Sequence, residues 1–65
     1  MIKYIVKCEE GFYTNLSFEP FSNDINKAKL YSMKSDALYR MKILNDYGCE
    51  DVKVGEVKVE IIEII

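Results

Sequence analysis

The first eight residues alternate between two faces. One face carries no charge and consists of Ile2, Tyr4, Val6 and Cys8. The other face carries two lysines and consists of Lys3, Ile5 and Lys7. A period of two with β-branched residues predicts a strand over residues 2–8. Residues 12–18 alternate again, with Phe12, Thr14, Leu16 and Phe18 on one face. The turn at residues 9–11 ends in a glycine, which adopts the left-handed conformation without steric cost, so we expect a hairpin of two antiparallel strands.

A loop follows the second strand. Pro20 has no N–H to donate to a neighbouring strand, so we expect the strand to stop there. Residues 19–27 are rich in turn-forming side chains, and Asp24 is placed to cap a short helical turn. Residues 29–32 fit either a short edge strand or an extended connector, and the pattern does not decide between the two.

A helix is predicted from Asp36 to Tyr47. Ser35 is a favourable N-cap, Asp36 suits the positive end of the helix dipole, and Gly48 is a candidate C-cap. At about 100° per residue the apolar side chains form two stripes. The first stripe holds Ala37, Leu38, Met41 and Leu44, and the second holds Tyr39, Ile43 and Tyr47. A helix that lies on one sheet needs only one of these stripes for its core.

Residues 52–65 predict a last, long strand. Gly55 suggests a bend or a bulge between an apolar pair, Val52 and Val54, and an apolar run, Val57, Val59 and Ile61. The chain then forms a single domain over residues 1–65 with the order β-β-(short element)-α-β. This is an α+β fold in which one helix packs on a small three- to four-stranded antiparallel or mixed sheet. We expect the core between the two layers to hold Ile2, Tyr4, Val6, Leu16, Phe18, Val57, Val59, Ala37, Leu38, Met41 and Leu44.

The second face of the sheet is left without a helix to cover it. Its expected apolar members are Ile5, Tyr13, Ile62 and Ile64. Either the loop of residues 19–33 folds over this face, or the face is a dimer or partner interface. The Tyr39, Ile43 and Tyr47 stripe is a second candidate interface, because tyrosine is enriched where proteins bind each other. The alternative is that this stripe packs against Phe21, Ile25 and Leu30.

Composition narrows the classes of function. The chain has 65 residues and a net charge of −2, with no basic excess to follow a phosphate backbone, so nucleic-acid binding is disfavoured. A weaker hypothesis is that the chain binds nucleic acid through five lysines: Lys3, Lys7, Lys27, Lys29 and Lys34. Residues 45–65 carry six acidic and two basic side chains, which either are simply solvated or steer a basic partner.

The sequence lacks the residues that most catalytic mechanisms need. There is no histidine, which removes Ser-His and Cys-His pairs and most zinc sites, and the three glycines are isolated, so no phosphate-binding loop is present. We therefore expect no enzyme and no cofactor or metal. Lysines interrupt the apolar residues at the start of the chain, so we expect a cytoplasmic protein with no membrane segment. We expect the two cysteines to be free thiols, with a single Cys8–Cys49 disulfide as the alternative.

Two stretches carry a resemblance: Ile-Lys-Tyr-Ile-Val-Lys-Cys-Glu-Glu-Gly-Phe-Tyr at the start, and Asn-Lys-Ala-Lys-Leu-Tyr-Ser-Met-Lys-Ser-Asp-Ala-Leu before and into the helix. The layout resembles small orphan proteins of phages and prophages of low-GC Gram-positive bacteria, with Ala28, Tyr31 and Ala37 at packing positions. The resemblance implies modulation of a host protein, since this group includes anti-CRISPR and other anti-defence inhibitors. The hypothesis is a non-enzymatic module that blocks a host protein sterically, and the alternative is a self-associating homodimer with no other target.

Overall fold

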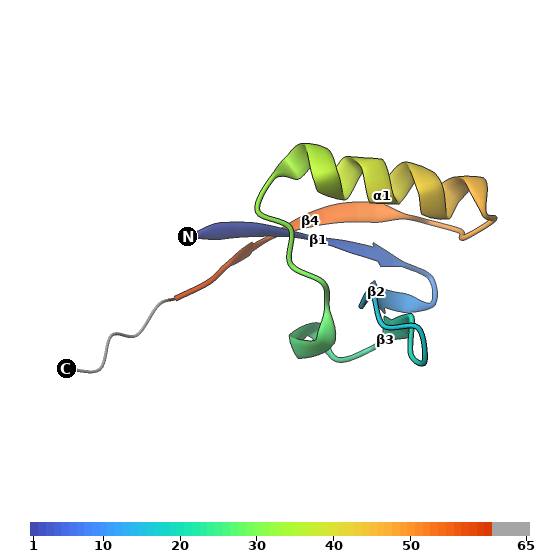
Figure 1. The fold of residues 1–65 in the computed structure, drawn as a ribbon, viewed down its shortest axis with the longest axis horizontal. Helices are drawn as coiled ribbons and strands as arrows, with labels where there is room; N and C mark the ends of the chain where they lie inside the picture. Colours follow the sequence, from blue (N-terminus) through green and yellow to red (C-terminus); the bar gives the residue numbers. More distant parts are fainter. Residues whose placement is uncertain (61–65) are drawn as a thin grey trace.

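A computed structural model describes residues 1–60, and this part of the chain forms a four-stranded antiparallel sheet with one helix. The strand order is β3-β2-β1-β4, and α1 contacts β1 and β4 on one face of the sheet (Figure 1). The α+β prediction is confirmed. The elements are β1 (Ile2–Cys8), β2 (Gly11–Tyr13), β3 (Phe21–Ser22), the 3-10 helix η1 (Ile25–Lys27), α1 (Lys34–Asp46) and β4 (Lys53–Lys58).

The pairing of β1 with β4 is continuous. It runs from Ile2 opposite Lys58 to Lys7 opposite Lys53 without an extra residue, so Gly55 makes no bulge. Successive side chains of a strand point to opposite faces, so Val54, opposite Val6, faces α1 and Val57 faces away. The prediction that Val57 and Val59 lie beneath the helix is therefore wrong, because the unbroken pairing places Val57 opposite Lys3, on the face away from α1.

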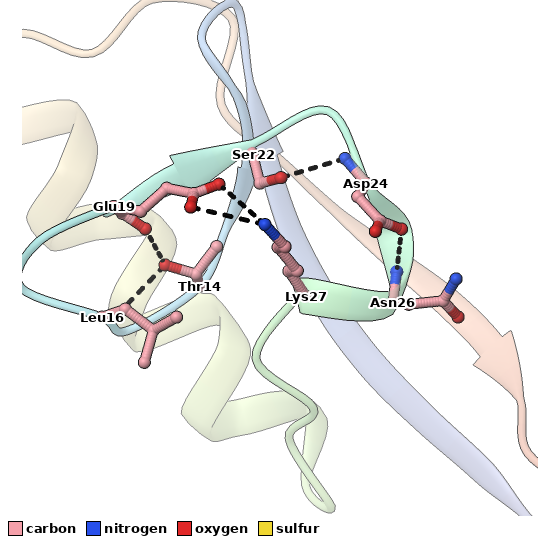
Figure 2. A network of polar contacts seen from close by, with 7 residues as sticks. All are labelled: Thr14, Leu16, Glu19, Ser22, Asp24, Asn26 and Lys27. Atoms are coloured by element: carbon pink, nitrogen blue, oxygen red, sulfur yellow. Dashed lines mark hydrogen bonds and ion pairs between the residues drawn. The ribbon is translucent and has the colours of Figure 1, made fainter.

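The second strand is much shorter than the alternation of residues 12–18 predicts. β2 ends at Tyr13, and the Thr14 hydroxyl donates a hydrogen bond to the Glu19 carbonyl while accepting one from the Leu16 N–H (Figure 2). This local bonding competes with the strand ladder and closes a turn, in which Asn15 has a φ of 64°. Leu16 and Phe18 consequently lie outside the core, and the Phe18 side chain is 82% exposed.

The loop after β3 contains the helical turn that the sequence predicts. The Asp24 side chain accepts a hydrogen bond from the Asn26 N–H at 2.9 Å and caps η1, and Lys27 forms an ion pair with Glu19 at 3.4 Å (Figure 2). Tyr31 then pairs with Tyr4 through two 2.8 Å backbone hydrogen bonds. The ambiguous segment is thus a connector that forms one bridge to β1 before it crosses to the helix.

Helix α1 begins and ends differently from the two predicted caps. It starts at Lys34 after an N-cap residue, Met33, whose side chain makes no capping hydrogen bond, so Ser35 lies within the first turn. The C-terminal end agrees with the prediction more closely. Gly48 has a φ of 90°, and backbone hydrogen bonds join Gly48 to Asn45 and Cys49 to Leu44, which is the pattern of a glycine-terminated helix.

The core is small and lies between α1 and the sheet. Its buried centre is Val6, Ala37 and Leu44. Half-buried side chains from the four strands, from α1 and from the segments before and after α1 surround that centre: Tyr4, Tyr13, Phe21, Tyr31, Met41, Cys49, Val52 and Val54. Leu38, expected in the core, is 40% exposed because only a narrow stripe of the helix meets the sheet. None of the helices in the described part of the chain has the length and apolarity needed to cross a bilayer.

Candidate functional site

The outer side of α1 carries the largest exposed aromatic surface of the helix. Tyr39 and Ile43 of α1 and Tyr47, the C-cap residue, recur every four residues, and we call these three the outer helix stripe. Tyr39 is 66% exposed, Tyr47 is 86% exposed and Ile43 is half-buried. The alternative partners lie elsewhere, since Phe21 packs in the core cluster and Ile25 and Leu30 line a cavity beside β4. The stripe is therefore available to another molecule.

The C-terminal end of the outer helix stripe is hollowed and acidic. A shallow cavity of about 410 Å³ is lined by Ile43, Asp46 and Tyr47. Asp46 is followed by Glu50 and Asp51, and the last turn of α1 has no basic residue. An acidic side chain at the edge of an apolar strip favours a partner whose binding surface is apolar at its centre and basic at its edge.

The face of the sheet opposite α1, which we call the open face, is partly covered. Because Tyr31 pairs with Tyr4, Leu30 lies beside Ile5 on this face, and Gly55 lies on the other side of Ile5. Ile5 is only 6% exposed. The loop before α1 therefore covers Ile5, and the assignment of Ile5 as an interface residue is wrong. Ile62 and Ile64, assigned to the same interface, lie outside the described residues.

Tyr13 also belongs to the fold more than to a surface. Its half-buried ring packs against the core and meets the Phe21 ring edge-on, with centroids 6.0 Å apart. The Arg40 guanidinium lies 5.1 Å from the centre of the same ring, and the Tyr13 hydroxyl donates a 3.0 Å hydrogen bond to Asn15. These contacts fix Tyr13 between α1 and β3, so it is not a free interface residue as the sequence pattern indicated.

Tyr31 and Arg40 lie at the junction of the connector and α1. Burial raises the pKa of the Tyr31 hydroxyl above its usual value of 10.0, and the Arg40 guanidinium beside it acts in the opposite direction. The Arg40 Nε is buried without a hydrogen-bond partner within the described residues. The Arg40 guanidinium therefore lies beside both the Tyr13 ring and the Tyr31 hydroxyl, where α1 meets the sheet.

The raised pKa of Tyr31 predicts a loss of stability at alkaline pH. The folded state binds the phenolic proton more tightly than the unfolded chain, so the free energy of unfolding falls as the pH rises through the unfolded value of 10.0 toward the higher folded value. Below pH 10 this contribution is fully present. Urea unfolding at pH 8 and pH 11 measures it, with Tyr31→Phe as the control. A variant that loses as much stability as the wild type over this range contradicts the assignment.

An apolar groove on the open face was not predicted from the sequence. It has a volume of about 500 Å³ and runs between η1 and the end of β4, lined by Ile25, Asn26, Ala28, Leu30, Val57, Lys58 and Val59. Two features escaped the sequence pattern, the unbroken phase of β4 across Gly55 and the path of the connector. The alternation of Val57 and Val59 was visible, but it was assigned to the face beneath the helix.

The two cysteines lie close together and are not bonded. Cys8 is buried at the end of β1, and Cys49 is half-buried just after α1. Burial raises the pKa of the Cys49 thiol, and the neighbouring Cys8 and Glu10 raise it further. Both side chains are free thiols in this structure.

No protein family matches this chain, and neither the curated proteins nor the solved structures contain a significant match to it. The resemblance to small phage proteins therefore remains a hypothesis about its function.

Proposed function

We propose that the protein is a small non-enzymatic binding module that attaches to another protein through the outer helix stripe. The exposure of Tyr39 and Tyr47 on either side of Ile43 is the observation that carries this proposal. Tyrosine contributes a large, rigid and amphipathic contact area, and residues of this type dominate the energy of many interfaces. In a protein of this size the helix core uses Ala37 and Leu44, so the stripe is not needed to hold the fold.

The mechanism in this proposal is steric. The stripe enters an apolar cleft of the partner, and Asp46, Glu50 and Asp51 meet basic groups at its rim and speed the encounter. The layout shared with small phage proteins suggests the class of partner, a host protein of a low-GC Gram-positive bacterium, with a defence protein as the particular case. Such an inhibitor acts in the host cytoplasm and needs no cofactor.

Removal of both tyrosines tests this function. A Tyr39→Ala/Tyr47→Ala variant, tagged and purified from cells of such a bacterium, should retain at least about tenfold less of any partner that the wild type retains, since each interface tyrosine is worth about 1–2 kcal/mol or more. The matched control is Lys42→Ala/Asn45→Ala, which removes two exposed side chains from other positions of α1. A partner that both variants retain as well as the wild type would show that the stripe does not bind it.

Self-association is the second candidate function, and the edge position of β4 favours it. One side of β4 pairs with β1, and no strand within residues 1–60 pairs with the other side. Antiparallel pairing of two β4 strands about Val57 would place Glu56 of each copy opposite Lys58 of the partner's strand. Sedimentation equilibrium at micromolar concentration separates the candidates, because a homodimer through β4 should dissociate in Glu56→Lys and stay intact in Tyr39→Ala.

A further inference from the structure

We infer that Cys8, Cys49 and Glu10 form a binding site for a thiophilic divalent cation of the zinc type. The two Sγ atoms and one carboxylate oxygen of Glu10 all lie within 4.8 Å of one another. This group lies where the Glu9–Glu10 turn meets the loop that follows α1. The sequence alone did not suggest it, because the cysteines are 41 positions apart and the intervening chain has no histidine.

The fold brings these three ligands together from three different segments. Cys8 is the last residue of β1, Glu10 lies in the turn that follows, and Cys49 is the residue after the glycine that ends α1. A backbone hydrogen bond of 3.1 Å from the Glu9 N–H to the Glu50 carbonyl holds the turn against the loop after the helix. The Cys49 N–H donates to the Leu44 carbonyl at 3.0 Å, which fixes that residue as well. The ligands are therefore placed by the backbone and not by mobile side chains alone.

The donor set selects the class of ion. Two sulfurs and one carboxylate oxygen suit zinc, whereas magnesium and calcium take oxygen ligands alone. With Zn–S bonds of about 2.3 Å and Zn–O bonds of about 2.0–2.2 Å, the ligand atoms of one tetrahedral ion lie about 3.5–3.8 Å apart, so a movement of about 1 Å completes the site. Glu10 is exposed and has the freedom to make this movement.

The three protein ligands leave the fourth tetrahedral position for a water molecule. Binding converts Zn²⁺, two thiols and one carboxylate into a complex of net charge −1, and the two thiol protons pass to solvent. A small cavity of about 160 Å³ lined by Lys7, Cys8, Asp51 and Lys53 opens beside the site, and the Lys53 amine is held 3.5 Å from the Asp51 carboxylate. Cys8 thus borders this cavity as well as the cluster of ligands.

Zinc titration of the reduced, full-length chain tests this inference. Calorimetry with Zn²⁺ should give one ion per chain, and Co²⁺ should produce the absorption of a thiolate-to-metal charge transfer. Loss of a ligand should weaken binding at least as much as loss of an outer-shell partner, about 10–100-fold, so Cys49→Ser and Glu10→Gln should both lower the affinity by that factor or more. Zinc should also raise the unfolding temperature of the wild type more than that of Cys49→Ser at the same zinc concentration.

Glu9→Gln is the matched control, because Glu9 is next to Glu10 in the sequence, carries the same charge and is not part of the cluster. It should bind zinc as the wild type does. Cys8 is buried, so zinc binding by Cys8→Ser is interpreted only if its circular dichroism spectrum matches that of the wild type. The Cys49→Ser and Glu10→Gln variants decide the outcome on their own. The inference is overturned if zinc does not bind, if Cys49→Ser or Glu10→Gln binds like the wild type, or if the thiols form a disulfide that zinc does not prevent.

Discussion

Replacement of Gly11 by alanine is expected to unfold the protein or to detach β3 from the sheet. Gly11 has a φ of 121°, a region that other residues rarely adopt, and a Cβ there would lie 2.6 Å from the backbone carbonyl oxygen of Ser22. The strained backbone costs about 1–3 kcal/mol. The overlap with a backbone atom that cannot rotate away costs about 1–3 kcal/mol more. A domain of 65 residues has only about 3–10 kcal/mol of stability in total.

The other glycines provide the controls for Gly11→Ala. Gly48 also has a positive φ, 90°, but a Cβ there meets no atom within 4 Å, so Gly48→Ala should cost only about 1 kcal/mol. At Gly55 the Cβ would make an ordinary 3.5 Å contact with Ile5, and the effect should be smaller still. Urea unfolding followed by circular dichroism ranks the three. A Gly11→Ala variant no less stable than Gly48→Ala would contradict the close approach of β3.

Tyr13→Ala is expected to destabilise the fold by about 2–4 kcal/mol, somewhat below the loss for a fully buried aromatic residue. The substitution removes the packing on the core, the edge-on contact with Phe21 and the cation–π contact with Arg40. It also leaves the Asn15 side chain without its partner. The free energy of unfolding from urea titration measures the effect.

Tyr39→Ala is the matched comparison for Tyr13→Ala. It removes the same side chain from an exposed position of α1, so stability should change by no more than about 0.5 kcal/mol. The alternation of the strand and the stripe of the helix made the two tyrosines equivalent interface candidates. Equal losses of stability in the two variants would show that the distinction between core and surface drawn here is wrong.

The elements themselves were largely predictable from the sequence. A period of two identified β1, and the turn residues at 9–11 identified the hairpin. The helix was identified by its apolar stripes, and its C-terminal end by Gly48. The N-terminal end was placed two residues late, because Ser35 is a better capping residue than Met33 and yet the helix begins at Lys34. Local preference was overruled there by the path of the connector from Tyr31.

The assignment of faces was less predictable than the elements. The alternation of residues 12–18 looks like a strand, but Thr14 forms hydrogen bonds within its own turn, and this information is not present in a hydrophobic pattern. The phase of β4 depends on whether Gly55 bulges, which is decided by pairing with β1. The burial of Ile5 depends on where the connector runs. The Thr14 bonds are local polar contacts, and the phase of β4 and the burial of Ile5 depend on long-range contacts, so hydrophobic periodicity alone determines none of the three.

The candidate site also depends partly on local spacing and partly on long-range contacts. The outer helix stripe was predictable because a helix fixes the relative positions of residues four apart. Its exposure was not, since it required knowing that Phe21, Ile25 and Leu30 pack elsewhere. The Cys8, Glu10 and Cys49 cluster was invisible, because antiparallel pairing and the end of α1 bring together residues that the sequence keeps far apart.

Photocrosslinking in living cells tests most directly the claim that the outer helix stripe is the binding surface. A benzophenone amino acid is placed singly at Tyr39, at Tyr47 or at Asn23, an exposed loop position remote in sequence from the stripe. We expect one and the same protein to be crosslinked from Tyr39 and Tyr47 and not from Asn23. Crosslinking from Asn23 alone, or no crosslinked protein from either position of the stripe, contradicts it.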